Sequence, residues 1–166
     1  MSDEAAALIE RLAEQGLTLA AAESLTGGAL TAELIRIPGA SAVVRGGIVA
    51  YASELKASLL GVDPAILAEH GPVHPEVATA MAQGVRTAAA VDGRAADLGV
   101  ATTGVAGPDA QGAAPVGLVY VAVADARGTR VRELHLEGDR PAIRLRAVEE
   151  AIALVREHLA SREYPT

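Results

Sequence analysis

The chain has 166 residues, a length that suits one domain of ordinary size, so we expect residues 1–166 to form a single domain. Hydrophobic residues make up 51% of it and charged residues 21%, a balance that excludes an intrinsically disordered protein. The net charge is −7 and Phe and Trp are absent, so we expect no direct nucleic-acid partner, which needs basic grooves and stacking rings.

The first predicted element is an acidic amphipathic helix. The segment MSDEAAALIERLAEQG has helical apolar spacing, acidic residues in its first turn and Gly16 at its end. It lacks the basic and apolar regions of a signal peptide, and no apolar run in the chain approaches the ~20 residues that span a bilayer. We therefore expect a cytoplasmic protein with no membrane partner.

Strands and helices alternate along the rest of the chain. In order, we expect a strand at 17–24, a helix at 27–37, a strand at 45–51, helices at 53–60, 63–71 and 75–91, a strand at 97–107, a hairpin of strands at 116–125 and 129–138, a helix at 141–158, and a frayed tail over about 160–166. This alternation implies an α/β fold. Its largely parallel sheet of about five strands is covered on both faces, and the hairpin makes one strand antiparallel.

Three polar, Gly-rich segments follow predicted strands. They are ESLTGG at 23–28, YASELK at 51–56 and TTGVAGP at 102–108. In open α/β sheets, ligands bind outside the carboxyl ends of the strands. We therefore expect these three segments to converge on one site.

The segment ESLTGG suits an anion. Gly27 and Gly28 let the backbone approach a ligand closely, and the N–H groups at a helix N-terminus attract a phosphate or a developing oxyanion. The segment matches neither the Walker motif nor the dinucleotide-binding glycine pattern. The alternative is that Ser24 or Thr26 only caps the helix.

A nucleophilic serine needs a base, and the histidines are poor candidates. His158 lies in the last helix and His135 in the second strand of the hairpin, where both suit structural or surface roles. His70 and His74 are four residues apart, but a Gly-Pro pair between them breaks any helix. The chain has no cysteine, so thiolate sites are excluded as well. We expect no metal and no cofactor.

Lys56 is the candidate base. It is the single lysine among 14 basic residues, and its apolar setting, LKASLL, favours a lowered pKa through burial. Tyr51 lies five residues earlier and is placed to relay a proton. A rival arrangement is SELK itself, in which Ser53 and Lys56 form the S-x-x-K tetrad of serine β-lactamases, although the K-T-G element of those enzymes is missing. Ser53 also suits a helix N-cap.

Several motifs together resemble a known family. AAESLTGG, PGASAVVRGGIVAYASELK, LLGV, TGVAGP, PVGLVYVAV and GDRPAIR, in that order, resemble the CinA C-terminal domain family, also called PncC, the nicotinamide mononucleotide amidohydrolases. The likeness covers about residues 5–160. It implies a three-layer α/β/α fold with a mixed five-stranded sheet. It also implies hydrolysis of nicotinamide mononucleotide to nicotinic acid mononucleotide and ammonia.

The resemblance also implies roles for particular residues. Ser24 and Lys56 match the serine and lysine of the family's catalytic dyad, and Tyr51 matches a tyrosine near it. Ser53 stands where relatives usually carry asparagine, which favours Ser24 as the nucleophile. His74 stands where a serine is common, a change that suits a helix cap.

The expected mechanism is acyl transfer. Ser24 attacks the carboxamide carbon, Lys56 takes its proton directly or through Tyr51, and water hydrolyses the acyl-enzyme after ammonia leaves. The oxyanion is stabilised by N–H groups either around Gly46 and Gly47 or directly after Ser24.

The phosphate has two candidate sites. One is formed by the N–H groups at 26–28 and the other by the loop at 103–107, each with help from Arg140, for which the alternative is an ion pair with Asp139. The candidate substrate-binding residues are therefore Thr26, Gly27, Gly28, Gly46, Gly47, Thr103, Gly104, Gly107 and Arg140.

Two other functions stay open, a non-catalytic nucleotide-binding or regulatory protein linked to competence or DNA damage, and an amidase for another small amide. The Ala-rich composition and the habit of the family favour a homo-oligomer, most simply a homodimer.

Overall fold

The structure is a computed structural model that describes residues 3–162, and it is built from alternating strands and helices. The elements, in chain order, are α1 (Glu4–Glu14), β1 (Leu19–Glu23), α2 (Ala29–Ile35), the 3-10 helix η1 (Ala40–Ala42), β2 (Val44–Val49), α3 (Ser53–Leu60), α4 (Pro64–His70), α5 (Pro75–Ala88), β3 (Leu98–Gly104), β4 (Leu118–Asp125), β5 (Gly128–His135) and α6 (Arg140–Ala160).

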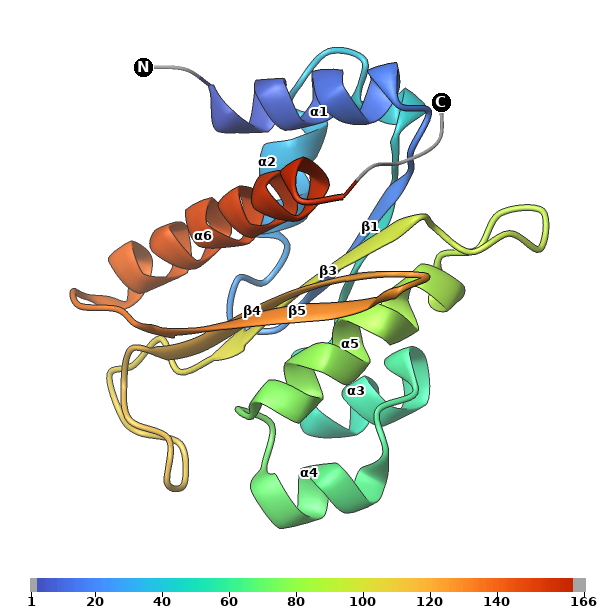
Figure 1. The fold of residues 1–166 in the computed structure, drawn as a ribbon. Coiled ribbons are helices and arrows are strands. Elements are labelled where there is room, and N and C mark those ends of the chain that lie inside the picture. The colour runs from blue at the N-terminus through green and yellow to red at the C-terminus, as the bar shows by residue number, and fades with distance from the viewer. Residues whose placement is uncertain (1–2, 163–166) are drawn as a thin grey trace.

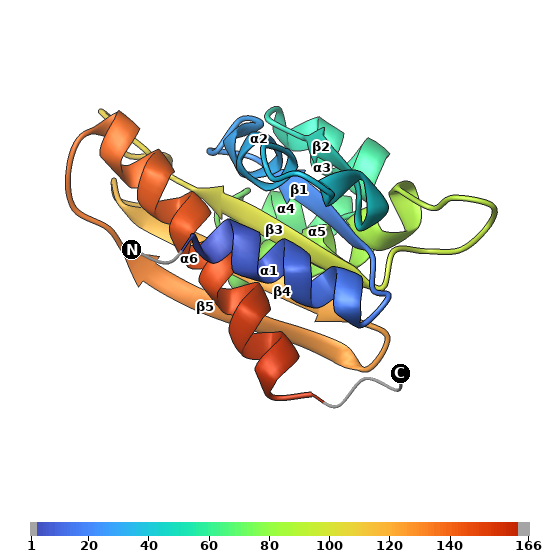
Figure 2. The same cartoon turned by 90° about the horizontal axis from the view of Figure 1, so that it is seen from above.

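The elements form three layers, with α1, α2 and α6 on one face of the sheet and α3, α4 and α5 on the other (Figure 1). Viewed from above, α1 and α6 cross the same face (Figure 2). The sheet order is β2-β1-β3-β4-β5. β1 pairs in parallel with β2 and β3, whereas β4 is antiparallel to both of its neighbours. The predicted three-layer fold with one reversed strand is thereby confirmed.

The composition of the central strand explains why both faces are covered. All five residues of β1 are buried. Because successive side chains point to opposite faces, Leu19 and Ala21 join the core under α1, α2 and α6, while Ala20 and Ala22 join the core under α5. At the sheet edge, β5 carries only half-buried and exposed residues, as suits a strand with one open side.

The register brings three strand ends together. Glu23, the last residue of β1, is paired with Val49 of β2 on one side and with Thr102 of β3 on the other. The residues that follow β1 and β2, and those at the end of β3, therefore meet at one edge of the sheet. This is the convergence that the sequence predicted.

The helix ends follow their sequence signals. Asp63 and Asp139 cap α4 and α6 by accepting from the N–H groups of Ala65 and Ala142, at 2.8 and 3.0 Å. α6 extends to Ala160, the first residue of the tail that was predicted to be frayed. Residues 163–166 of that tail lie outside the described residues.

None of the helices within residues 3–162 combines the length and the apolar content needed to cross a bilayer.

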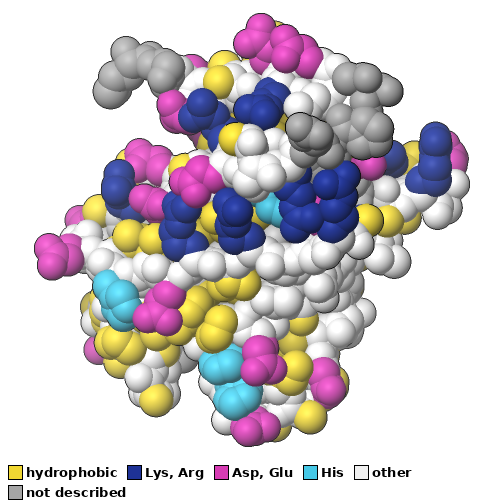
Figure 3. All heavy atoms as spheres, viewed as in Figure 1, with side chains coloured by type: hydrophobic (Ala, Val, Ile, Leu, Met, Phe, Trp, Pro, Cys, Tyr) yellow, Lys and Arg dark blue, Asp and Glu magenta, His cyan; other side chains and the backbone are white. Residues whose placement is uncertain are grey.

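The face with α6 carries basic side chains interleaved with acidic ones (Figure 3). Arg132 of β5 forms ion pairs with Glu150 and Glu157 of α6, and Arg146 pairs with Glu149. These basic groups are therefore neutralised by carboxylates of the same face.

A buried polar cluster ties the far end of α6 to β4. His158 is 1% exposed, and its Nε2 lies 3.0 Å from Oδ2 of Asp125. Nε of Arg162 lies 3.3 Å from the same carboxylate oxygen. Oδ1 of Asp125 accepts from the N–H groups of Arg127 and Gly128 in the turn that leads into β5. The cluster closes the hairpin and anchors the helix.

Candidate active site

Ser24 occupies the first position after β1, in a turn that Glu23 shapes. The carboxylate of Glu23 accepts from the N–H groups of Gly28, Leu30 and Thr31 at 2.9, 3.0 and 2.8 Å. It also accepts from the Thr31 hydroxyl at 2.6 Å. A side-chain carboxylate therefore occupies the N-terminus of α2 and fixes the turn that holds Ser24.

This cap corrects the first candidate site for the phosphate. The N–H of Gly28 is taken by Glu23, and the Thr26 hydroxyl is buried 2.8 Å from that of Thr102. Thr26, Gly27 and Gly28 do not line the cavity described below. The N–H groups of Gly27 and Gly28 are thus already bonded, to the carbonyl of Ser24 and to Glu23, which disfavours this turn as the phosphate site.

Lys56 enters the site from α3. Its side chain is 1% exposed, and its Nζ donates to Oγ of Ser24 at 3.0 Å and to the carbonyl of Ala50 at 2.8 Å. Within residues 3–162, Lys56 forms no ion pair. Burial lowers the pKa of this amine to about 8, and the nearby carboxylate of Glu54 opposes the shift only in part.

The lowered pKa gives the amine a chemical use. At pH 7, a pKa of about 8 leaves about one amine in ten neutral, compared with about one in three thousand for an unperturbed lysine. A neutral amine at 3.0 Å can accept the hydroxyl proton of Ser24. The structure therefore brings together Ser24 and Lys56, the two side chains that the sequence predicted to act as nucleophile and base.

Tyr51 and Arg140 stand at the rim of the site. Tyr51 is 61% exposed, and its hydroxyl accepts from Nη2 of Arg140 at 3.1 Å. Nη1 of Arg140 donates to the carbonyl of Gly107 at 2.6 Å. Neither of these bonds connects Tyr51 with Lys56, so the geometry favours direct proton transfer over a relay. The alternative predicted for Arg140 was an ion pair with Asp139. The carboxylate of Asp139 caps α6 instead.

A cavity of about 250 Å³ opens over the dyad. Of the predicted site residues, Ser24, Lys56, Tyr51, Thr103, Gly104, Gly107 and Arg140 line it. The sequence-based prediction missed Asp109 and Gln111, which belong to the Gly-rich loop after β3, and Pro72 and Val73 between α4 and α5. The polar character of the residues directly after TGVAGP was the signal that could have identified Asp109 and Gln111.

Two of the lining residues, Thr103 and Gly104, also stabilise the structure around the cavity. The Thr103 hydroxyl donates to the carbonyl of Pro72 at 2.7 Å and so joins two walls of the cavity. A Cβ at Gly104 would lie 2.7 Å from the carbonyl oxygen of Leu118, so glycine here permits the close approach of β4.

Gly46 and Gly47 lie away from the dyad. Both belong to β2, where they pair with Ala20 and Ala21 of β1, and neither lines the cavity. A Cβ at Gly47 would collide with the side chain of Thr31, so this glycine serves the packing of α2 on the sheet. The prediction that their N–H groups stabilise an oxyanion is not supported by this placement.

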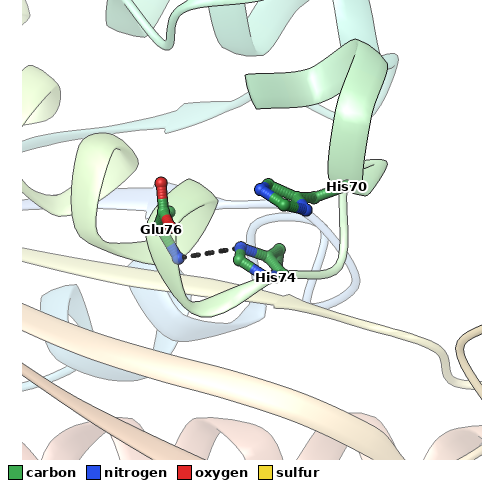
Figure 4. A group of neighbouring side chains, drawn as sticks. All are labelled: His70, His74 and Glu76. Atoms are coloured by element: carbon green, nitrogen blue, oxygen red, sulfur yellow. Dashed lines mark hydrogen bonds between the residues drawn. The ribbon is translucent and has the colours of Figure 1, made fainter. Parts of the chain in front are cut away.

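His70, His74 and Glu76 form a cluster beside the cavity wall (Figure 4). Their potential ligand atoms lie within 4.8 Å of one another. The two imidazole rings are stacked at 4.0 Å with an interplanar angle of 8°, and Nδ1 of His74 accepts from the N–H of Glu76 at 3.3 Å. Parallel rings cannot direct in-plane lone pairs at one ion, and His74 already caps α5. The cluster is therefore a stack and a helix cap, and we assign it no metal.

Comparison with known proteins identifies the family. The model of the CinA C-terminal domain matches residues 2–159. A CinA-like protein of Frankia casuarinae is 51% identical over 149 residues, which cover 90% of this chain and 33% of that protein. A CinA-like protein of Gloeobacter violaceus is 44% identical over 166 residues, which cover 98% of this chain and 37% of that protein. The chain thus spans about a third of the length of these curated relatives.

Solved structures agree with the sequence comparison. The competence/damage inducible protein CihA from Agrobacterium tumefaciens matches with a TM-score of 0.86 at 34% identity, over 95% of this chain and 96% of that chain. A competence-damaged protein (CinA) superfamily protein from Klebsiella pneumoniae matches with a TM-score of 0.89 at 30% identity, over 98% of this chain and 100% of that chain. The chain belongs to the CinA C-terminal domain family.

Proposed function

We propose that the protein is an amidohydrolase that converts nicotinamide mononucleotide to nicotinic acid mononucleotide and ammonia. The observation that carries this proposal is the contact of 3.0 Å between Nζ of Lys56 and Oγ of Ser24 at a cavity. A buried amine without a carboxylate partner has little structural purpose, because burying an uncompensated charge is costly. As the base for a serine nucleophile, the same arrangement is productive.

The chemistry proceeds in two halves. The neutral amine of Lys56 takes the hydroxyl proton while Oγ of Ser24 bonds to the carboxamide carbon. The tetrahedral intermediate then collapses, the carbon–nitrogen bond breaks, and the ammonium of Lys56 returns the proton to the leaving nitrogen, which departs as ammonia. In the second half, water attacks the ester with Lys56 as the base, which releases the carboxylate and restores the Ser24 hydroxyl.

The oxyanion is best served by the backbone directly after the nucleophile. Leu25 lines the cavity, and its N–H donates to no acceptor among the described residues. A donor of this kind, aimed at the developing charge, typically contributes ~3 kcal/mol to the transition state. Of the two sets left open by the sequence, we therefore propose the one that follows Ser24.

The rim matches the rest of the substrate. Arg140 uses two of its five N–H groups on Gly107 and Tyr51, and the others are left for a phosphate. The loop that supplies Thr103, Gly104 and Gly107 lies beside it along the same cavity. Asp109, the single acidic residue of the lining, suits a substrate with a cationic pyridinium ring. A free, neutral amide carries neither the negative charge of a phosphate nor the positive charge of a pyridinium ring.

The proposal is tested by incubating the purified protein with nicotinamide mononucleotide at a pH just above the pKa of Lys56. We expect ammonia and the acid product in equal amounts, and much slower release from nicotinamide and from nicotinamide riboside. Ser24→Ala serves as the control for contaminating activity. Product formation that is equal in this variant, or absent in the wild type, would contradict the proposal.

A further inference from the structure

A second arginine of α6 acts on the turn that holds the nucleophile. Arg144 lies one helical turn after Arg140 and is half-buried. Its Nε donates to the carbonyl of Leu25 at 2.9 Å, and its Nη2 donates to the carbonyl of Thr26 at 2.8 Å. Arg144 does not line the cavity over the dyad, so it reaches the site only through the backbone.

These two bonds complete the fixation of the turn. The carbonyl of Ser24 accepts from the N–H of Gly27 at 3.1 Å, so each carbonyl from Ser24 to Thr26 has a donor. In a trans peptide, the carbonyl and the N–H of the same plane point in opposite directions. Holding the carbonyls of Ser24, Leu25 and Thr26 therefore sets the direction of the next N–H group along the chain in each case, the first being that of Leu25.

The contact needs the shape of a guanidinium. Arginine presents two N–H groups in a planar fork that can hold two neighbouring carbonyls, whereas a lysine ammonium is a compact point charge on a flexible stem. Gly27 lies against this fork, since a Cβ there would be in ordinary contact with Nη2 of Arg144 at 3.4 Å. Glycine is also suited to the positive φ of 60° at this position.

We propose that Arg144 is a positioning residue for the reaction. By holding the Thr26 carbonyl, it fixes the peptide plane whose N–H, that of Gly27, donates to the Ser24 carbonyl. Through that bond it orients the Leu25 N–H toward the oxyanion and holds Ser24 against Lys56, while it contacts neither the substrate nor the reacting atoms. This inference rests on the proposed function, because it assigns Arg144 to the same site. It adds to the site a residue that lies 119 positions after Leu25, whose carbonyl it binds.

The test compares Arg144 with an arginine in a similar structural setting. Arg86 is also half-buried and donates from Nε to a backbone carbonyl, that of Ala96, at 2.9 Å, but it lies outside the cavity lining. We expect Arg144→Ala to lower kcat for nicotinamide mononucleotide by about 10²-fold, with KM changed less than about threefold, since a misplaced donor is felt mainly in the transition state. Arg86→Ala should leave kcat within about twofold, whatever it does to the melting temperature.

Two further readouts separate positioning from folding. Arg144→Lys keeps the charge without the fork, so we expect a loss of kcat close to that of Arg144→Ala. Added guanidinium ion should restore part of kcat in Arg144→Ala and none in Arg144→Lys, whose side chain fills the space. An unchanged kcat in Arg144→Ala, full activity in Arg144→Lys, or a loss of kcat that follows the unfolded fraction would each overturn the inference.

Failure of the substrate assignment can be told apart from failure of this inference. A fluorophosphonate reagent forms a bond between phosphorus and Oγ of Ser24 and releases fluoride, so it reports on the nucleophile without any amide. If the wild type is labelled but releases no ammonia from nicotinamide mononucleotide, the substrate is wrong. In that case, labelling of Arg144→Ala about 10²-fold slower than the wild type would still support positioning, and equal labelling would refute it.

Discussion

Two side chains of this protein, Lys56 and His158, are buried to the same extent but in opposite surroundings. Each is 1% exposed. His158 faces the buried carboxylate of Asp125, which also pairs with the half-buried Arg162, so a negative group and a positive group compensate each other here. Lys56 contacts only a hydroxyl and a carbonyl, those of Ser24 and Ala50, and has no ion-pair partner within residues 3–162.

The comparison shows that burial of an ionisable group has different consequences with and without an ion-pair partner. Burial lowers the pKa of both groups, but in His158 the hydrogen bond to the carboxylate of Asp125 works against that shift. A compensated cluster of this kind holds secondary-structure elements together, whereas burial without an ion-pair partner raises the neutral fraction of an amine, and the neutral amine can take a proton. We therefore expect the two regions to respond to mutation in opposite ways, one in rate and the other in stability.

The largest expected effect is that of Ser24→Ala. Removing the nucleophile should lower kcat by at least ~10³-fold, because no other group can form the acyl-enzyme. Ser53→Ala is the matched control, since Ser53 opens α3 but does not line the cavity, and should stay within about twofold of the wild type. An assay of ammonia release decides between them. If Ser53→Ala lost activity and Ser24→Ala kept it, the nucleophile would be Ser53.

The next effect contrasts the two buried groups directly. Lys56→Arg keeps a positive charge but cannot act as a base, so kcat should fall by ~10²- to 10⁴-fold. His158→Gln should leave kcat nearly unchanged and lower the free energy of unfolding by about 1–3 kcal/mol, because Asp125 loses a buried partner. Kinetics and denaturant unfolding of both variants supply the comparison. Near-normal turnover in Lys56→Arg would show that Lys56 only supplies charge.

A smaller effect is expected at the rim. Arg140→Ala removes charge-assisted hydrogen bonds worth about 1.5–3 kcal/mol, so KM for nicotinamide mononucleotide should rise by about 10- to 100-fold. The KM for nicotinamide riboside, which has no phosphate, should change much less. Equal changes for both substrates would mean that Arg140 supports the loop through Gly107 and does not bind the phosphate.

The smallest effect is the dependence on pH. With a pKa of about 8 for Lys56, kcat/KM should rise about tenfold between pH 7 and pH 9 and then level off. Stability has the same sign. Because the pKa is lower in the folded state than the value of 10.5 in the unfolded chain, the unfolded state binds more protons between about pH 8 and pH 10.5, and stability rises with pH across this window. In Lys56→Met, this rise should be absent.

Much of the site could be predicted because its signals are local. Alternating strands and helices placed Ser24, Tyr51 and Lys56 after strands that meet at one edge, and the apolar neighbours of the single lysine indicated its burial. The cap by His74 was also predictable, because it stands directly before Pro75 at the start of a helix. The cytoplasmic location and the homodimer stay predictions.

The remaining features depend on contacts that no local pattern records. The sequence pattern of ESLTGG assigned no role to Glu23, and only the fold shows its carboxylate turned back onto α2. Gly46 and Gly47 were interpreted as backbone donors, whereas the lack of a side chain at Gly47 serves the close packing of α2 on β2. Arg144 contacts a turn more than a hundred residues away, so its role follows from the position of α6.

The central claim is that the amine beside Ser24 is dry enough for about one molecule in ten to hold it neutral at pH 7. Because Lys56 is the single lysine of the sequence, protein labelled with [¹³Cε]lysine gives one side-chain signal whose titration by NMR needs no assignment. The account predicts a midpoint of about 8 that persists in Ser24→Ala. A midpoint at or above the ordinary lysine value of 10.5 would contradict it.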